Sequence, residues 1–361
     1  MDRKLKGLVL AGGHGTRLRP LTHTGPKQLI PIANKPNILY CIDDLRDAGI
    51  TDIGVILGNN MPQKVQELLG DGSKYGVKIT YIVQGEPKGI AHAIGVARDF
   101  MGNDPFCVYL GDNVLTGGIK EMVKDFIENG HEACIACSKV RDPQRFGIAE
   151  LDANGNIISL EEKPKVPKSD LALVGVYLLR ESIFDIISQL KPSWRNELEI
   201  TEAIDNLRKK TNRVHAHIIT GWWKDTGKPE DILEANRLVL DELKPEINGK
   251  IEDGAFVTGK VSIGSGTVIM KGSVVRGPSI IGNNCVIGPN TYIGPYTSIG
   301  DGSIIEGGEI EASIVVGEAK IKCGKKIVDS LIGKGSTILQ AEGMLPKGYR
   351  LTIGENSTVA I

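Results

Sequence analysis

The sequence predicts a two-domain protein in which an α/β domain with a mostly parallel sheet precedes a left-handed parallel β-helix. From Lys4 to about Ile135, short β-rich apolar runs alternate with segments whose apolar residues recur every three or four positions. This alternation is typical of a parallel sheet covered by crossover helices. Beyond residue 245, aliphatic residues recur at every sixth position, a period that neither an amphipathic strand nor an amphipathic helix explains. A length of 361 residues also favours two domains.

Four apolar runs in the first part of the chain are expected to form parallel strands. Between them lie segments with the three- and four-residue apolar spacing that predicts crossover helices. The expected strands are 5–11, 53–58, 77–84 and 106–111, and the expected helices are 37–48, 62–69, 90–100 and 119–128.

The pattern loosens after residue 135. The dipeptide Asn154-Gly155 suits a tight hairpin, because both residues tolerate positive φ. We place the domain boundary near Pro245, which gives domains of 1–245 and 246–361. The remaining elements expected in the first domain are hairpin strands at 148–151 and 157–160, a strand at 171–179, and helices at 199–209 and 230–242.

Hexads of similar sequence fill the second domain. They predict a triangular solenoid in which each hexad forms one side and points its aliphatic side chain inward. Glycine and asparagine are expected at the corners, where the backbone turns with positive φ. The nine aliphatic positions in the unbroken series are Val257, Ile263, Ile269, Val275, Ile281, Ile287, Ile293, Ile299 and Ile305.

The hexad pattern becomes irregular near its end. The segment 309–326 predicts an interrupted coil, with Ile332-Gly333 and Ile353-Gly354 as later fragments. We expect residues 349–361 to cap the open edge or to reach another subunit. Because the hexads offer no evident catalytic group, we expect the β-helix to build the contacts of a homo-oligomer.

Composition argues against several classes of protein. With 43 basic and 44 acidic residues and a formal net charge of −1, no overall positive field attracts nucleic acid or an anionic membrane. The apolar run Leu8–Ala11 is too short for a signal peptide, and no later run approaches a membrane span. We therefore expect a cytoplasmic protein.

Cys134 and Cys137 fall on one expected strand and point to opposite faces, so they cannot chelate zinc together.

The segment LAGGHGTRLRP follows the first expected strand. It is not a P-loop, because no Gly-Lys-Ser/Thr closes it, and it is not a dinucleotide fingerprint, because Leu18 occupies the third-glycine position. Its glycines, Gly12, Gly13 and Gly15, allow backbone N–H groups to approach phosphate oxygens, and Arg17 adds a charged donor fork. The segment therefore predicts a phosphate cradle of another kind.

Lys27, in GPKQLIPIANKP, follows closely enough to bring a second cation to the same phosphates. Together, LAGGxGTRLxP and PKxLxPI resemble the motifs of the sugar-1-phosphate nucleotidylyltransferases, which join a nucleoside triphosphate to a sugar 1-phosphate and release pyrophosphate. The resemblance implies a Rossmann-like nucleotidyltransferase domain. Gln28 and the repeat-bearing C-terminal part are most similar to the long-type glucose-1-phosphate thymidylyltransferases.

The resemblance implies a nucleotide pocket edged by Gln84 and Gly89. A glutamine amide can pair with a pyrimidine edge through both its donor and its acceptor. Thymine differs from uracil by one methyl group, worth roughly 1–3 kcal/mol in a pocket, so we expect dTTP as substrate with some use of UTP. The full set implied for the nucleotide is Leu10, Gly12, Gly13, Gly15, Thr16, Arg17, Gln28, Gln84 and Gly89.

Asp112 ends an expected buried strand, where ligands bind in open α/β sheets. Asp225, in GWWKDTG, resembles the second metal-binding carboxylate of the family. Two carboxylates and phosphate oxygens suit Mg²⁺, so the resemblance implies Mg²⁺ as cofactor. It further implies that the sugar phosphate is bound by Phe146, Gly147, Glu162, Lys163, Gly175, Arg195 and Trp223.

The implied reaction transfers a nucleotidyl group from dTTP to glucose 1-phosphate, giving dTDP-glucose and pyrophosphate. Catalysis is expected to rest on positioning and charge, through Arg17, Lys27, Asp112, Lys163 and Asp225. Another sugar-1-phosphate nucleotidylyltransferase, for example a UTP-dependent one, is the main alternative. An acetyltransferase in the β-helix is disfavoured because all six histidines precede the hexads. A non-catalytic regulatory subunit is disfavoured because all five charged positions are present.

Overall fold

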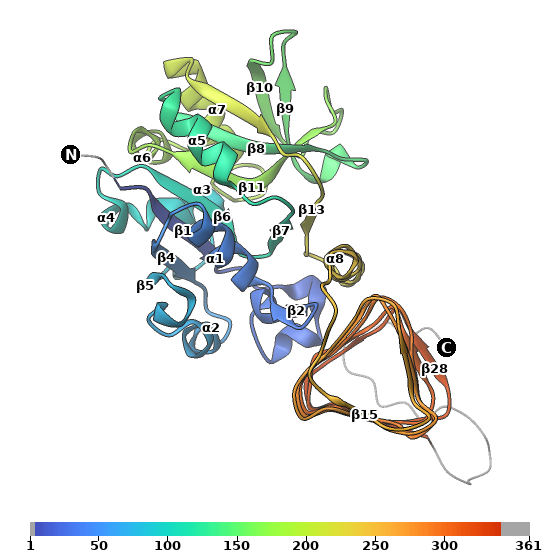
Figure 1. The fold of residues 1–361 in the computed structure, drawn as a ribbon. Coiled ribbons are helices and arrows are strands. Elements are labelled where there is room, and N and C mark those ends of the chain that lie inside the picture. Colours follow the sequence, from blue (N-terminus) through green and yellow to red (C-terminus); the bar gives the residue numbers. More distant parts are fainter. Residues whose placement is uncertain (1–3, 341–361) are drawn as a thin grey trace.

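Strand β1 (Lys6–Ala11) lies in the middle of the N-terminal sheet and pairs in parallel with β4 (Asp52–Leu57) on one side and β6 (Phe106–Leu110) on the other. The computed structural model, which describes residues 4–340, places β5 (Lys78–Val83) outside β4, again in parallel (Figure 1). All four strands begin and end within two residues of their predicted bounds. Their carboxyl ends meet at one edge of the sheet.

The sheet continues beyond β6 with antiparallel strands. The completely buried β11 (Leu171–Leu179) pairs antiparallel with β6 and also with β8 (Ala133–Lys139). The predicted hairpin is present as β9 (Gly147–Leu151) and β10 (Ile157–Glu162), and β9 also pairs with β11. The outer neighbour of β8 is β12 (Val214–Ile218), which the sequence did not indicate.

Helices cover both faces of this sheet and enclose two hydrophobic cores. Cys134 belongs to one core and Cys137 to the other, which confirms that they point to opposite faces of β8. One face carries α1 (Ile38–Asp47), α2 (Pro62–Leu69) and α5 (Lys120–Glu128). The other carries α3 (Ile90–Gly95), α4 (Arg98–Met101), α6 (Ser182–Ile187) and α7 (Ile200–Thr211).

The single helix predicted for 90–100 is wrong, because α3 ends at Gly95 and α4 begins at Arg98. Glycine and a β-branched valine at the break are poor helix formers. Elsewhere, two short antiparallel pairs lie outside the main sheet. They are formed by β2 (Pro31–Ile32) with β3 (Lys35–Pro36) and by β7 (Asn113–Leu115) with β13 (Trp223–Asp225).

After α8 (Pro229–Asp241), the chain winds into a parallel β-helix of triangular section (Figure 1). Each side of the triangle is one parallel sheet. The first contains β14 (Glu246–Ile247), β17 (Val261–Ile263), β20 (Ser279–Ile281), β23 (Thr297–Ile299), β26 (Ile314–Val315) and β29 (Leu331–Ile332). The second contains β15 (Lys250–Ile251), β18 (Val268–Ile269), β21 (Val286–Ile287), β24 (Ile304–Glu306), β27 (Lys320–Lys322) and β30 (Thr337–Leu339). The third contains β16 (Phe256–Thr258), β19 (Val274–Arg276), β22 (Tyr292–Ile293), β25 (Glu309–Glu311) and β28 (Lys326–Val328).

The hexad aliphatic residues line the interior of the β-helix as predicted, with Ile263 through Ile305 between 0% and 1% exposed. Asn284 and Asn290 turn corners with φ of 54°. Tyr296 takes the same conformation with φ of 61°, although nothing in the sequence marks it for positive φ.

The interruption predicted for 309–326 is wrong, because the three sheets continue through it. The coil shortens instead: Ile281 pairs with Ile299, eighteen residues on, whereas Ile304 pairs with Lys320, sixteen residues on. Corners with fewer residues keep Ile310, Val315 and Ile321 facing inward, each 0–1% exposed. Residues 349–361 and the Ile353-Gly354 fragment lie outside the described residues.

The two parts of the chain share a small hydrophobic core. Leu18 of the glycine-rich segment and Ile232 of α8 pack in the same cluster as Ile314 of the β-helix. The two parts therefore pack against each other. The division of the chain into two domains at residue 245 stays a prediction.

Asn236 of α8, which is 0% exposed, holds this contact together with three hydrogen bonds. Its Oδ1 accepts from the Ala33 backbone N–H at 2.8 Å and from the Ser298 hydroxyl at 2.7 Å, and its Nδ2 donates to the Tyr296 carbonyl at 3.0 Å. All three hydrogen bonds of the Asn236 side-chain amide therefore join α8 to another segment of the chain.

We expect Asn236→Ala to lower the free energy of unfolding by about 2–4 kcal/mol, because it removes the partners of one buried and two partly buried polar groups. The control is Arg237→Ala, which removes an exposed ion pair with Asp329 and should cost less than about 1 kcal/mol. Denaturation midpoints of the two variants provide the measurement. Equal midpoints would show that Asn236 does not hold the two parts together.

Candidate active site

Two carboxylates meet at the carboxyl end of β6. Asp112 lies two residues beyond this strand, and Asp225 ends β13, whose pairing with β7 sets Asp225 opposite Asn113. Thr226 locks the arrangement, because its backbone N–H and its hydroxyl donate to the Asp112 carbonyl at 3.0 and 2.8 Å. Residues more than a hundred positions apart in the sequence thus share one site.

The Lys27 ammonium forms an ion pair with the Asp112 carboxylate. Burial alone would lower the pKa of Lys27, but the nearby charge of Asp112 and its hydrogen bond outweigh burial and raise this pKa. Burial raises the pKa of Asp225 to about 6, and the charge of Asp112 adds to the shift, while Lys27 and Arg17 oppose it. The two carboxylates therefore repel each other, and the positive charges of Lys27 and Arg17 offset only part of the combined effect of burial and this repulsion.

The glycine-rich segment wraps closely around Lys27. Gly15 has a φ of 62°, and its carbonyl accepts a hydrogen bond from the Thr22 hydroxyl at 2.8 Å. A Cβ at Gly13 or Gly15 would lie 3.5 or 3.2 Å from Lys27 side-chain atoms. Thr16 opens the short 3₁₀ helix that follows, Thr16–Leu18, and the buried Leu18 anchors it. The segment and the lysine are thus held as one unit.

Arg17 reaches toward the same place. A Cβ at Gly227 would lie 2.7 Å from Nη2 of Arg17 and 3.3 Å from Oδ1 of Asp225. The structure therefore brings Arg17, Lys27, Asp112 and Asp225 together at the carboxyl edge of the sheet.

The residues expected to contact the base lie at the neighbouring strand ends. Leu10, near the end of β1, is 8% exposed. Gly12 follows β1 and Gln84 follows β5, and a Cβ at Gly12 would lie 2.5 Å from Oε1 of Gln84. Gly89 has a φ of 102°, and a Cβ there would lie 2.5 Å from the Leu198 carbonyl. The structure thus brings Gly12 against Gln84, whereas Gly89 packs against the backbone of Leu198.

Gln28 differs from that group because it is 1% exposed. Its Cγ lies 3.2 Å from the position of a Cβ at Gly111, and its Oε1 has no hydrogen-bond partner among the described residues. The structure places Gln28 beneath the surface rather than at an open edge.

A cavity of about 200 Å³ opens beside the paired carboxylates. Ten residues singled out from the sequence line it, whereas the other members of the nucleotide set and Lys27 lie outside its lining. The ten are Arg17, Asp112, Phe146, Gly147, Glu162, Lys163, Gly175, Arg195, Trp223 and Asp225.

Glu162 is held in place at this cavity by two neighbours. Its Oε2 accepts from the Thr201 hydroxyl at 2.6 Å, and its Oε1 accepts from Nη1 of Arg195 at 3.2 Å. Positions 147 and 175 have no space for a larger side chain. A Cβ at Gly147 would lie 2.6 Å from a neighbouring side chain, and a Cβ at Gly175 would lie 2.8 Å from one. The carboxylate of Glu162 is thereby fixed on the cavity wall.

Phe146 and Trp223 form an aromatic wall of the cavity, packed edge to face with their centroids 5.3 Å apart. The Trp223 indole N–H donates to Oδ1 of Asn113 at 2.7 Å. The wall is therefore tied to the residue that follows Asp112.

Lys163 lies in a strained backbone conformation, with φ of 45°. Its N–H donates to the Phe146 carbonyl at 3.0 Å, and its Nζ lies 3.6 Å from Oε1 of Glu162. For a residue other than glycine, this left-handed conformation costs roughly 1–2 kcal/mol. Strain of this kind is often found at functional sites.

Arg195, expected to contact the sugar phosphate, pairs with the carboxylates of Glu162, Glu197 and Glu199. Burial raises the pKa of Glu199, although the Ser193 hydroxyl opposes that shift.

Several residues that line the cavity were not predicted from the sequence. They include Arg145, Glu197, Glu199, Thr201 and Asn113. For Glu197 and Glu199, the available signal was the alternation of charged residues in RNELE, because alternate side chains of an extended segment point to one side.

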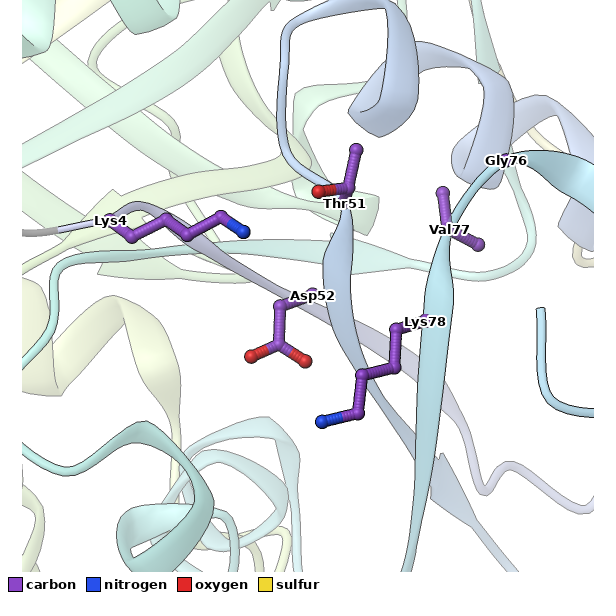
Figure 2. Close-up of a pocket in the computed structure, with 6 residues that line it drawn as sticks. All are labelled: Lys4, Thr51, Asp52, Gly76, Val77 and Lys78. Atoms are coloured by element: carbon purple, nitrogen blue, oxygen red, sulfur yellow. The ribbon is translucent and has the colours of Figure 1, made fainter. Parts of the chain in front are cut away.

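A second hollow lies at the opposite edge of the sheet (Figure 2), where β4 and β5 begin. Asp52 and the lysines Lys4 and Lys78 line it together with Thr51, Gly76 and Val77. It contains none of the residues predicted to act in the reaction.

In the part of the chain that the structure describes, none of the helices has the length and apolar character that a membrane span requires.

The fold is an α/β sheet with charged residues gathered at its carboxyl edge, followed by a parallel β-helix. Residues 6–242 match the family model described as nucleotidyl transferase, and residues 260–295 and 278–308 match the bacterial transferase hexapeptide model. The chain belongs to the nucleotidyl transferase family and carries the left-handed hexapeptide β-helix predicted from its repeats. The resemblance to sugar-1-phosphate nucleotidylyltransferases is confirmed.

Relatives match the chain over nearly its whole length. It is 52% identical to the low-salt glycan biosynthesis nucleotidyltransferase Agl11 of Haloferax volcanii, over 99% of this chain and 100% of the relative. It is 45% identical to a glucose-1-phosphate thymidylyltransferase of Streptomyces antibioticus, over 99% of each chain. A crystal structure of a UDP-glucose pyrophosphorylase with UDP-glucose is 28% identical, with a TM-score of 0.60, over 66% of this chain and 99% of that one.

The strain at Lys163 can be measured with two substitutions that remove the same charge. We expect Lys163→Gly to be more stable than Lys163→Ala by about 1 kcal/mol, because only glycine adopts this φ without cost. The denaturation midpoint of the glycine variant should be roughly 2–4 °C higher. The same pair at the exposed Lys165, whose φ is not positive, should show no such gain. A less stable glycine variant at 163 would contradict the strain.

Proposed function

We propose that this protein transfers a thymidylyl group from dTTP to glucose 1-phosphate, releasing dTDP-glucose and pyrophosphate. The observation that carries the proposal is the meeting of two carboxylates, the loop cations and Lys163 beside one cavity. The name of the Streptomyces antibioticus relative, 45% identical over 99% of each chain, supports this choice of substrates.

Acidic side chains slightly outnumber basic ones around the cavity before any substrate arrives. Five basic and six acidic side chains line it or pair with its lining, so a further positive charge is required to hold two anionic substrates. A divalent ion held by Asp112 and Asp225 fits this need, because two oxygen ligands and phosphate oxygens suit Mg²⁺. The eleven residues are Arg17, Lys27, Arg145, Lys163 and Arg195, and Asp112, Glu162, Glu197, Glu199, Asp225 and Asp231.

In the proposed reaction, a phosphate oxygen of glucose 1-phosphate attacks the α-phosphorus of dTTP. A new oxygen–phosphorus bond forms as the bond to the β-phosphate breaks, and pyrophosphate leaves with the electron pair. The attacking phosphate is already largely ionised near pH 7, so no general base is required. When bound, Mg²⁺ supplies positive charge that stabilises the transferring phosphoryl group.

The remaining work falls to side chains that position the two anions. Lys163 holds the attacking phosphate, and Arg17 and the glycine-rich segment hold the departing phosphates. Lys27, paired with Asp112, lies where it can turn toward the α-phosphate. Glu162 accepts hydrogen bonds from sugar hydroxyls, and Arg195 keeps this carboxylate oriented. Catalysis thus rests on alignment and fixed charge.

Base recognition is assigned to Gln84, whose amide closes over Gly12. A UTP-dependent reaction is the second candidate, favoured by the likeness to the UDP-glucose pyrophosphorylase structure. Acetyl transfer is disfavoured, since all six histidines of the sequence precede the hexads and such transfer generally requires a base. The β-helix is proposed to support oligomer contacts.

Asp225→Asn tests the role of the paired carboxylates. Because burial already favours the neutral form of this group, we expect the variant to fold, while kcat with Mg²⁺ falls by roughly 10²–10³-fold. Asp44→Asn is the matched control, since burial raises the pKa of Asp44 to about 6 as well and the residue lies outside the cavity. Pyrophosphate release measures both. Near-normal turnover in Asp225→Asn would remove this residue from the mechanism.

A substrate panel tests the proposed specificity. Pyrophosphate release is measured for four nucleoside triphosphates, each combined with several sugar 1-phosphates. We expect the highest kcat/KM for dTTP with glucose 1-phosphate, and a value for UTP lower by roughly 10–200-fold, because one methyl group is worth about 1–3 kcal/mol in a pocket. A higher value for UTP would replace the first candidate with the second.

A further inference from the structure

We propose that Asp125, His131 and His215 form a binding site for a transition-metal cation, best suited to Zn²⁺. The three side chains come from α5, from the turn that follows it and from the edge strand β12. None of them lines the cavity described above. The proposed site is therefore separate from the paired carboxylates Asp112 and Asp225.

The three potential ligand atoms converge, all lying within 4.8 Å of one another. Oδ2 of Asp125 is 3.7 Å from Nε2 of His131 and 3.4 Å from Nε2 of His215. Zinc bonds of about 2.0–2.2 Å place neighbouring ligand atoms of a tetrahedron about 3.3–3.6 Å apart. The two separations from Oδ2 of Asp125 are close to this spacing. The lone pair of an imidazole nitrogen lies in the plane of its ring, so the two stacked rings must rotate about their side-chain bonds before both nitrogens face one ion.

Hydrogen bonds do not account for the cluster. Oδ2 of Asp125 and Nε2 of His131 are both buried, and neither has a hydrogen-bond partner among the described residues. Buried polar atoms are normally satisfied, so each exception calls for an explanation. A cation between these atoms would satisfy both of them at once.

The two imidazoles are arranged as neutral ligands. His131 and His215 stack with their ring centroids 4.8 Å apart and their planes 7° from parallel, a position in which two protonated rings would repel each other. A neutral imidazole has the lone pair that a metal requires.

Asp125 is oriented by the residue that follows α5. Its Oδ1 accepts a hydrogen bond from Nδ2 of Asn129 at 2.7 Å, which leaves Oδ2 directed at the imidazoles. Hydrogen bonds of this kind commonly fix metal-binding carboxylates. The cluster lies close to the surface, since the side chains of Asp125, His131 and His215 are 27%, 20% and 40% exposed, although Oδ2 of Asp125 and Nε2 of His131 are themselves buried.

The ligand set selects the cation. Two imidazole nitrogens and one carboxylate suit Zn²⁺, whereas Mg²⁺ and Ca²⁺ prefer oxygen ligands. A cation held here would join α5 to β12, a strand whose ladder partner is β8. It would thus stabilise the edge of the sheet.

The experiment uses the full chain, stripped with EDTA and dialysed against Zn²⁺ in the presence of excess Mg²⁺, followed by metal analysis. We expect about one Zn²⁺ per chain, and the same in an Asp225→Asn background, which excludes the paired carboxylates as the source. His215→Gln and Asp125→Asn should each weaken Zn²⁺ binding at least tenfold. His217→Gln is the matched control, because His217 lies on the same strand but outside the cluster, and it should bind as the unchanged protein does.

A second measurement does not depend on the variants being stable. Zn²⁺ at about a hundred times its dissociation constant should raise the denaturation midpoint of the stripped protein by several degrees. Co²⁺ should give the visible absorption of a nitrogen-ligated ion. Absence of Zn²⁺ in the unchanged protein, or equal loss in His217→Gln and His215→Gln, would overturn the assignment.

Discussion

The proposed active site depends on the antiparallel pairing of two three-residue strands, β7 and β13. This pairing carries Asp225 across the structure to Asp112 beyond the end of β6, and Thr226 fixes the junction with two hydrogen bonds. Burial keeps the two carboxylates in a setting of low polarity, where each feels the charge of the other strongly. Lys27 offsets part of that charge, and the remainder is the basis on which a divalent ion is proposed there.

The glycine-rich segment, which carries Arg17, is held in place by contacts with other parts of the chain. Leu18, one residue after Arg17, packs in a cluster that includes Ile314 of the β-helix. Asn236 adds hydrogen bonds between α8, the segment near Ala33 and the β-helix. The β-helix is therefore part of the support for the residues proposed to bind phosphate, in addition to its proposed role in assembly. A long, regular solenoid suits this purpose because neighbouring coils brace one another.

The two halves of the N-terminal sheet contribute different parts of the site. The parallel strands end in the residues assigned to the nucleotide, from Gly12 to Gln84. The antiparallel strands and the turns beside them supply the residues assigned to the sugar phosphate, including Glu162 and Lys163. At Lys163 the backbone holds a conformation unfavourable to a lysine. The surrounding strands must therefore stabilise it, and the charge is presented in a fixed position.

The sequence alone determined the parallel strands, most helices, the inward aliphatic residues of the β-helix and the motifs around Gly12 and Lys27, because each follows from local periodicity or turn chemistry. Tertiary structure alone decided the features that require contact between distant segments. These are the β7–β13 pairing beside Asp112, the edge position of β12, the shortened coils near Ile310 and the three carboxylates around Arg195. A short strand carries too few residues for a period, and an ion pair across the chain leaves no local pattern.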